Sequence, residues 1–130
     1  MVVVPAQRSD RLNARDIGLI FKRRKLFWDD GTRIEPVNLP ADQPLRQRFS
    51  HSVLRLSPEA LEAFWNEQYF HGVLPPHVLA SEAAVLRFVA DTATAIGYLS
   101  ACMVDARLRP VLVITVDGRQ LLPDAMPACN

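Results

Sequence analysis

The sequence has few of the residues that build common catalytic and metal sites. Its five glycines are scattered along 130 residues and form no phosphate-binding loop, so nucleotide binding is not expected. His51, His71 and His77 include no pair three or four residues apart, the spacing that places two imidazoles on one helix face. No serine lies in a G-x-S-x-G motif. We therefore expect no metal, no cofactor and no enzymatic activity.

Cysteine and excess charge are equally scarce. The net charge of +1 and the isoelectric point near 7.9 give no basic excess, so nucleic acid is not an expected partner. The two cysteines, Cys102 and Cys129, do not have the spacing of a metal-binding pair. A disulfide between them and two free thiols both stay open, and we expect free thiols.

Long hydrophobic runs are missing as well. No run reaches the length of a membrane span, and the apolar run 2–4, stopped by Pro5, is too short for the core of a signal peptide. The 49% apolar and 22% charged residues suffice for one globular domain with its own core. We expect a single domain over residues 1–130, with residues 117–130 as a loose tail.

Periodicity and capping residues predict alternating strands and helices. Apolar spacing and caps predict helices over residues 8–25, 44–56 and 57–72 and from residue 81 onward, and β-branched runs predict strands over 2–4, 34–39, 95–99 and 111–116. Pro36 should confine its strand to an edge or its own end. The alternation predicts an α/β fold in which helices cover a sheet.

Three local clusters each allow two interpretations. The basic run 22–25 is predicted to be a solvated helix end, with a patch for an anion or acidic partner as the alternative. Asp29 and Asp30, before Gly31, are predicted to form a turn rather than an acid–base pair. The aromatic residues of the 57–72 helix are predicted to pack in the core, with a ligand or partner surface as the alternative; they are Phe64, Trp65, Tyr69 and Phe70.

An ordered set of motifs over roughly residues 2–100 resembles a known family. The motifs are a helix ending Ile20-Phe21, the turn Trp28–Gly31, the strand Ile34–Asn38, a helix entered through Pro40 that contains Arg46 and Phe49, the capped helix Ser57–Tyr69 and the strand Ala95–Tyr98. This order resembles the phosphate-type periplasmic solute-binding proteins of ABC transporters, and more narrowly their small relatives that amount to one lobe of the usual two. The resemblance implies a single lobe of the type 2 periplasmic-binding-protein fold, with a mixed sheet flanked by helices. It also implies a periplasmic location and recognition of an oxyanion, phosphate or sulfate, at a helix start.

The corner between the strand 34–38 and the next helix departs from the family pattern. The family has a basic or polar residue, proline, an acid and then Gly-Ser-Gly-Thr, which lets backbone N–H groups close on phosphate. Here Leu39 replaces the basic residue, Ala41 the acid and residues 42–45 the Gly-Ser-Gly-Thr. Pro44 has no N–H to donate, and Asp42 is negatively charged. We expect Asp42 or Gln43 to cap this helix in place of an anion.

These observations give two hypotheses for function. The first is a non-enzymatic solute-binding-protein-like domain with a degenerate phosphate site, acting through protein contacts or another ligand. The second is a true phosphate or oxyanion receptor that uses Arg46 and the helix start near Gln43, with Arg48 and the basic run 22–25 as further cations. The candidate ligand-binding residues are Asp42, Gln43 and Arg46. A lone lobe leaves half of a cleft open, so a homodimer or a membrane-associated protein partner is expected.

Overall fold

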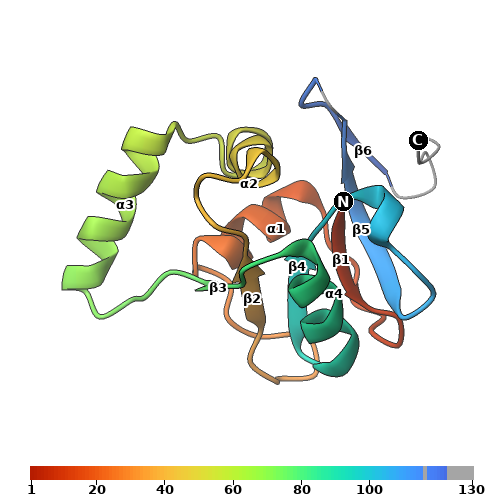
Figure 1. The fold of residues 1–130 in the computed structure, drawn as a ribbon. Coiled ribbons are helices and arrows are strands. Elements are labelled where there is room, and N and C mark those ends of the chain that lie inside the picture. The colour runs from red at the N-terminus through yellow and green to blue at the C-terminus, as the bar shows by residue number, and fades with distance from the viewer. Residues whose placement is uncertain (116, 123–130) are drawn as a thin grey trace.

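The computed structural model describes residues 1–115 and 117–122 and is built on one six-stranded sheet (Figure 1). The strand order is β3-β2-β4-β1-β5-β6. The strands are β1 (Val2–Pro5), β2 (Glu35–Asn38), β3 (His77–Val78), β4 (Ala95–Tyr98), β5 (Leu108–Ile114) and β6 (Gln120–Leu121). β2 runs parallel to β3 and β4, whereas β1 is antiparallel to β4 and β5, and β6 to β5. The prediction of a mixed α/β fold is confirmed.

Four α-helices and two shorter helical turns complete the described chain. They are α1 (Ala14–Phe21), α2 (Pro44–Phe49), the π-helical turn η1 (Ser50–Leu54), α3 (Pro58–Phe70), α4 (Glu82–Asp91) and the 3₁₀ turn η2 (Ala101–Met103). Polar caps fix three of the starts: Asn13 and Asp16 form a reciprocal capping box at α1, and Ser57 and Ser81 accept bonds from Ala60 and Ala84 N–H. None of these helices is both long and apolar enough to cross a bilayer.

The two faces of the sheet are covered by different helices. Side chains alternate along β4, so Gly97 and Tyr98 point to opposite faces. A Cβ placed on Gly97 would lie 2.9 Å from Val85 and 3.3 Å from Val89, which puts α4 against that face. On the other face, the Tyr98 ring stacks on Phe49 of α2 at 4.1 Å. The sheet is therefore flanked by helices on both faces, as expected.

A trio of buried aromatic rings anchors α1 and α2 to the sheet. Phe21 meets Phe49 edge-on at 4.7 Å and Tyr98 at 6.0 Å. The Tyr98 hydroxyl donates to Asn38 Oδ1 and accepts the N–H of Leu39 at 3.2 Å. Burial raises the pKa of Tyr98 to about 12, although the Leu39 N–H and nearby Arg46 act against the shift. The end of β4 is thus tied directly to the residues that follow β2.

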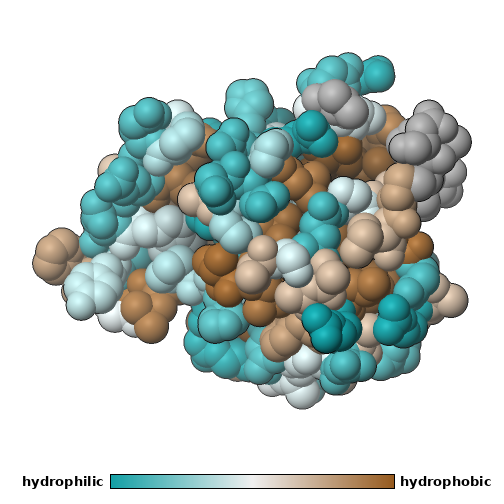
Figure 2. Space-filling model, viewed as in Figure 1, coloured by the Kyte–Doolittle hydropathy of each residue, from teal (hydrophilic) through white to brown (hydrophobic). Residues whose placement is uncertain are grey.

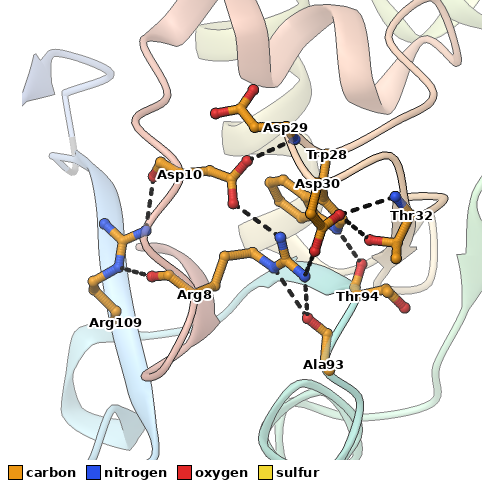
Figure 3. Close-up of polar contacts among 9 residues, drawn as sticks. All are labelled: Arg8, Asp10, Trp28, Asp29, Asp30, Thr32, Ala93, Thr94 and Arg109. Carbon is orange, nitrogen blue, oxygen red and sulfur yellow. Dashed lines mark hydrogen bonds and ion pairs between the residues drawn. The ribbon is translucent and has the colours of Figure 1, made fainter.

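A hydrogen-bond network centred on Arg8 stabilises the opposite edge of the sheet, meaning the end of the strands where β1 finishes and β4 begins (Figure 3). Its Nε and Nη2 donate to the Ala93 carbonyl at 3.0 and 2.9 Å, and its guanidinium lies 4.3 Å from the Trp28 ring centroid. Nη1 pairs with Asp10 at 2.9 Å, and Arg109 donates to the carbonyls of Arg8 and Asp10. These bonds join the segment after β1, the turn after α1 and the connection before β4.

Several predicted boundaries differ from the structure for local reasons. α1 ends at Phe21 because Arg23 adopts a left-handed conformation with φ of 61°, so the basic run 22–25 follows the helix. The predicted helix 44–56 changes to π-helical geometry at Ser50 and stops at Arg55, which is also left-handed. Pro36 lies in an interior strand, yet β3 pairs only with the two residues after it. Strand β3 was not predicted.

The C-terminal region also differs from expectation. Within the predicted tail 117–130, Gln120–Leu121 form β6, while residues 123–130 lie outside the described part of the chain. The prediction of free thiols is wrong for Cys102, which is disulfide-bonded. Cys129 lies outside the described residues.

The aromatic residues of α3 do not form the predicted core cluster. The helix stands away from the sheet, joined to it by a segment at each end (Figure 1). Leu61 is its only buried residue, Phe64 and Trp65 are half-buried, and Tyr69 and Phe70 are 66% and 85% exposed. Figure 2 shows apolar surface at the end of this helix that lies farther from α2. The core prediction is therefore wrong for Tyr69 and Phe70.

We predict that Gly97→Ala destabilises the protein by about 1–3 kcal/mol, because the added methyl would overlap Val85 and Val37. Urea denaturation followed by circular dichroism measures the change. Gly18→Ala is the control: its methyl would lie 3.4 Å from the Val53 carbonyl, and alanine favours a helix by up to ~1 kcal/mol. Equal stability of the Gly97→Ala variant and the wild type would show that α4 lies farther from β4.

We predict that Arg8→Lys lowers the free energy of unfolding by about 1–3 kcal/mol, since lysine cannot make the paired bonds to Ala93 while stacking on Trp28. The same denaturation measurement reports it. Arg11→Lys, at an exposed position in the same segment, should change stability by less than ~0.5 kcal/mol. A matching loss in both variants would contradict a specific role for Arg8.

We predict that Tyr98→Phe costs about 1–3 kcal/mol at neutral pH, because Asn38 Oδ1 and the Leu39 N–H lose a buried partner. The folded-state pKa of Tyr98 is raised, so its stabilisation is complete below pH 10.0 and falls as pH rises to about 12. The free energy of unfolding of the wild type should therefore approach that of Tyr98→Phe over this range. Tyr69→Phe, at an exposed position, should follow the wild type throughout.

Candidate functional site

The candidate site lies where β2 and β4 end. These strands are parallel, so their last residues, Asn38 and Tyr98, lie at the same edge of the sheet, the one formed by the carboxyl ends of β2 and β4. Ligands of open α/β sheets bind outside the carboxyl ends of the strands. The corner of residues 39–46 follows β2 at this edge and leads into α2. This corner is therefore a candidate ligand site.

Two positions at the start of α2, Gln43 and Pro44, offer no backbone donor to an anion. Gln43 is the N-cap residue, and no side chain makes a capping hydrogen bond there. The Gln43 N–H is itself bonded to the Pro40 carbonyl at 3.0 Å, and Pro44 occupies the first helical position without an N–H. The expectation that Asp42 or Gln43 caps the helix through its side chain is wrong. Pro44, whose ring fixes a helical φ, supports the helix start instead.

The three predicted ligand residues lie in the turn before α2 and in its first turn. Asp42 and Gln43 are exposed in the turn before α2. Arg46 is half-buried, and its Nη1 donates to the Leu39 carbonyl at 2.9 Å. One donor of Arg46 thus links the first turn of α2 to the residue that begins the corner. A guanidinium has five N–H donors, and this bond uses one of them.

A groove of about 680 Å³ lies beside the corner, between α3 and the α2–η1 segment. The wall on the α2–η1 side is polar and consists of Arg46, Gln47, Ser50 and His51. The other side is mainly apolar and consists of Leu56, Ser57, Pro58, Leu61, Glu62 and Trp65, with Ala41 at the corner. The volume falls within the range of sites for small organic molecules, roughly 300–1,000 Å³.

The polarity of the two walls follows from helical spacing. Arg46 and Ser50 are four residues apart, so they share one side of the helical segment, while Phe49 turns into the core. Leu61 and Trp65 are also four apart and line the facing side of α3. Ser50 is a polar residue only 8% exposed and lies in the polar wall. The groove therefore has one hydrogen-bonding wall and one apolar wall.

Sequence reasoning found the corner but missed the groove. The stripe of polar residues at 46, 47, 50 and 51 is visible in the sequence as two pairs at four-residue spacing. The apolar side was assigned to the core because α3 carries many aromatic residues. The signal that could have corrected this is the weak sidedness of α3, whose apolar residues do not form one stripe.

A second hollow, of about 270 Å³, lies at the opposite edge of the sheet. It is lined by the segment 7–10, by Asp29 and Asp30, and by Ala93. Three of its charged groups are paired with one another, Arg8 with Asp10 at 2.9 Å and with Asp30 at 3.9 Å. This hollow therefore belongs to the network that closes that edge.

Comparison with known proteins gives similarity in structure but not in sequence. No protein-family model matches the chain, and no curated protein matches it. One similar solved structure, from Clostridium perfringens, is provisionally assigned as a phosphate ABC transporter substrate-binding protein and holds bound phosphate; the TM-score is 0.69, the identity 17%, and the match covers 85% of this chain and 42% of that one. Another is an ABC-type phosphate transport receptor from Vibrio cholerae, with a TM-score of 0.63, 18% identity, and coverage of 83% and 43%.

These likenesses establish the fold. The chain spans about two fifths of the length of each of the two structures. The six-stranded mixed sheet and its helices thus correspond to part of a phosphate ABC transporter substrate-binding protein. The expected fold class is confirmed: the chain has the fold of a single periplasmic-binding-protein-like lobe.

Proposed function

We propose that the chain is a non-enzymatic solute-binding lobe whose corner no longer binds inorganic phosphate by the family route. It acts instead through another ligand or through protein contacts. The similar structures are transport receptors rather than enzymes, which supports a binding role. Their transport role also supports a periplasmic location, with a membrane-associated protein or a second copy as the partner.

The observation that carries this proposal is the loss of donors at the corner. The Gln43 N–H is bonded to Pro40, and Pro44 has none. Arg46 is tethered to the Leu39 carbonyl. Phosphate recognition at a helix start requires several backbone N–H groups aimed at one point, together with a site that tolerates negative charge. The Asp42 carboxylate adds an opposing charge to this corner.

The alternative is an oxyanion receptor that uses Arg46 and the helix start near Gln43. The unused donors of the Arg46 guanidinium favour it, as does the phosphate bound in the Clostridium perfringens structure. Under this alternative, phosphate or sulfate would be held by a side chain rather than by a ring of backbone N–H groups. Its affinity would then fall steeply with salt.

Isothermal titration with inorganic phosphate distinguishes the two. We expect no saturable binding to the wild type at micromolar phosphate. We also expect a gain of binding when residues 42–45 are replaced by Gly-Ser-Gly-Thr, because this restores the missing N–H and removes the acid.

Arg46→Ala and Arg11→Ala form the matched pair for this experiment, because Arg11 is exposed and lies in neither the corner nor the groove. Micromolar binding by the wild type that is lost in Arg46→Ala and kept in Arg11→Ala would establish the oxyanion receptor in place of the proposed function. Sulfate, titrated in parallel, tests whether any binding depends on oxyanion charge alone.

A further inference from the structure

We propose that the groove between α3 and the α2–η1 segment binds a small aromatic or cyclic organic monoanion. The anionic group would lie against Arg46 and the apolar body against Leu61 and Trp65. This inference rests on the proposed function, in that it supplies the other ligand that a lobe without a phosphate corner would take.

The groove has the size and lining of a site for a small organic molecule. At about 680 Å³ it is far too large for an inorganic oxyanion, but it suits a small organic molecule. Small-molecule sites combine mostly apolar walls with a few convergent polar groups. The apolar residues Leu56, Leu61 and Trp65 form such a surface, opposite the polar wall.

The half-buried indole of Trp65 gives the groove an aromatic surface. Trp65 packs edge-on against Phe64 at 4.9 Å, which holds its ring in place while part of it remains exposed to the groove. A fixed aromatic face beside Leu61 favours a flat apolar body over a flexible one, because stacking then costs little side-chain entropy. The ligand body is therefore assigned as a ring.

Two charged side chains of opposite sign, Arg46 and Glu62, line the groove. Arg46 is oriented by its bond to Leu39, and its other donors are free to bind a planar anionic group in a paired manner. Ser50, a residue only 8% exposed, lies in the same wall and adds a hydroxyl group. Glu62 is the acid that lines the groove, and it is exposed on the α3 side. Its charge disfavours a second anionic group at the far end of the ligand, so a monoanion fits better than a dianion.

The chain has two tryptophans, so nuclear magnetic resonance can use one indole signal as a reporter of binding in the groove and the other as a control. Trp65 lines the groove, whereas Trp28 is 2% exposed at the opposite edge, with its Nε1–H bonded to the Thr94 carbonyl at 2.9 Å. The ¹⁵N-labelled chain is titrated with 2-naphthoate. The expected result is a saturable shift of the Trp65 indole signal, while the Trp28 signal stays in place.

Three further ligands test separately the need for a negative charge, for a ring and for only one charge. The neutral isostere 2-naphthamide should bind at least about tenfold more weakly, as should acetate, which has the charge without the ring. Naphthalene-2,6-dicarboxylate should bind more weakly than 2-naphthoate, and Glu62→Gln should narrow that difference. Equal binding of naphthoate and naphthamide would reduce the site to a non-specific apolar surface and overturn the proposal. So would the absence of a Trp65 shift.

Substitutions at two arginines of α2 test whether Arg46 binds the anionic group. Arg46→Gln should weaken naphthoate binding at least about tenfold, Arg46→Lys should retain part of it, and Arg48→Gln, on the same helix but outside the groove, should leave it unchanged. Equal losses in Arg46→Gln and Arg48→Gln would overturn the assignment of Arg46. The amide pattern of each variant shows whether it is folded.

Inorganic phosphate in the same experiment keeps the two proposals separate. If phosphate saturably shifts the amide signals of residues 41–43 and 45, the proposed loss of the phosphate corner is contradicted, whatever naphthoate does. Naphthoate that fails to shift Trp65, together with an unresponsive corner, would contradict only the groove ligand.

Discussion

The link between Tyr98 and the residues that follow β2 is the interaction on which the rest of the candidate site depends. One hydroxyl group donates to the Asn38 side chain and accepts the Leu39 N–H, so it satisfies two polar groups that are otherwise removed from water. The ring beneath it stacks on Phe49, which fixes α2. The positions of Leu39, of the corner and of Arg46 all follow from this contact.

The two edges of the sheet are stabilised by different chemistry. At the edge with the corner, buried aromatic rings and a tyrosine hydroxyl hold the elements together. At the opposite edge, the guanidinium of Arg8 satisfies the Ala93 carbonyl and stacks on Trp28. The polar network therefore lies away from the corner. The corner rests on a rigid apolar base, which suits a binding site because its walls need not rearrange to admit a ligand.

The corner and the groove place different chemistry side by side on one scaffold. A proline and an acid at the start of α2 are compatible with the helix, but the proline has no N–H to donate to an anion and the acid carries a charge of the same sign as phosphate. The same helix continues into the π-helical turn at Ser50, which carries the polar wall along one side. α3 then stands off from the sheet (Figure 1), and the groove lies between α3 and the α2–η1 segment. Fold similarity at 17% identity establishes the scaffold and leaves the ligand to be argued from these side chains.

The sequence by itself determined the element types and most helix starts, because these depend on local chemistry. Asn13, Ser57 and Ser81 cap their helices within three residues, and the β-branched run after Met1 forms the predicted strand. Only the tertiary structure decided which apolar residues are buried. Tyr69 and Phe70 match a core pattern but are exposed, because burial depends on how far α3 lies from the sheet. The groove likewise needs two helices that are joined through Arg55 in a left-handed conformation, and the relative placement of two helices is not encoded in the spacing of either one.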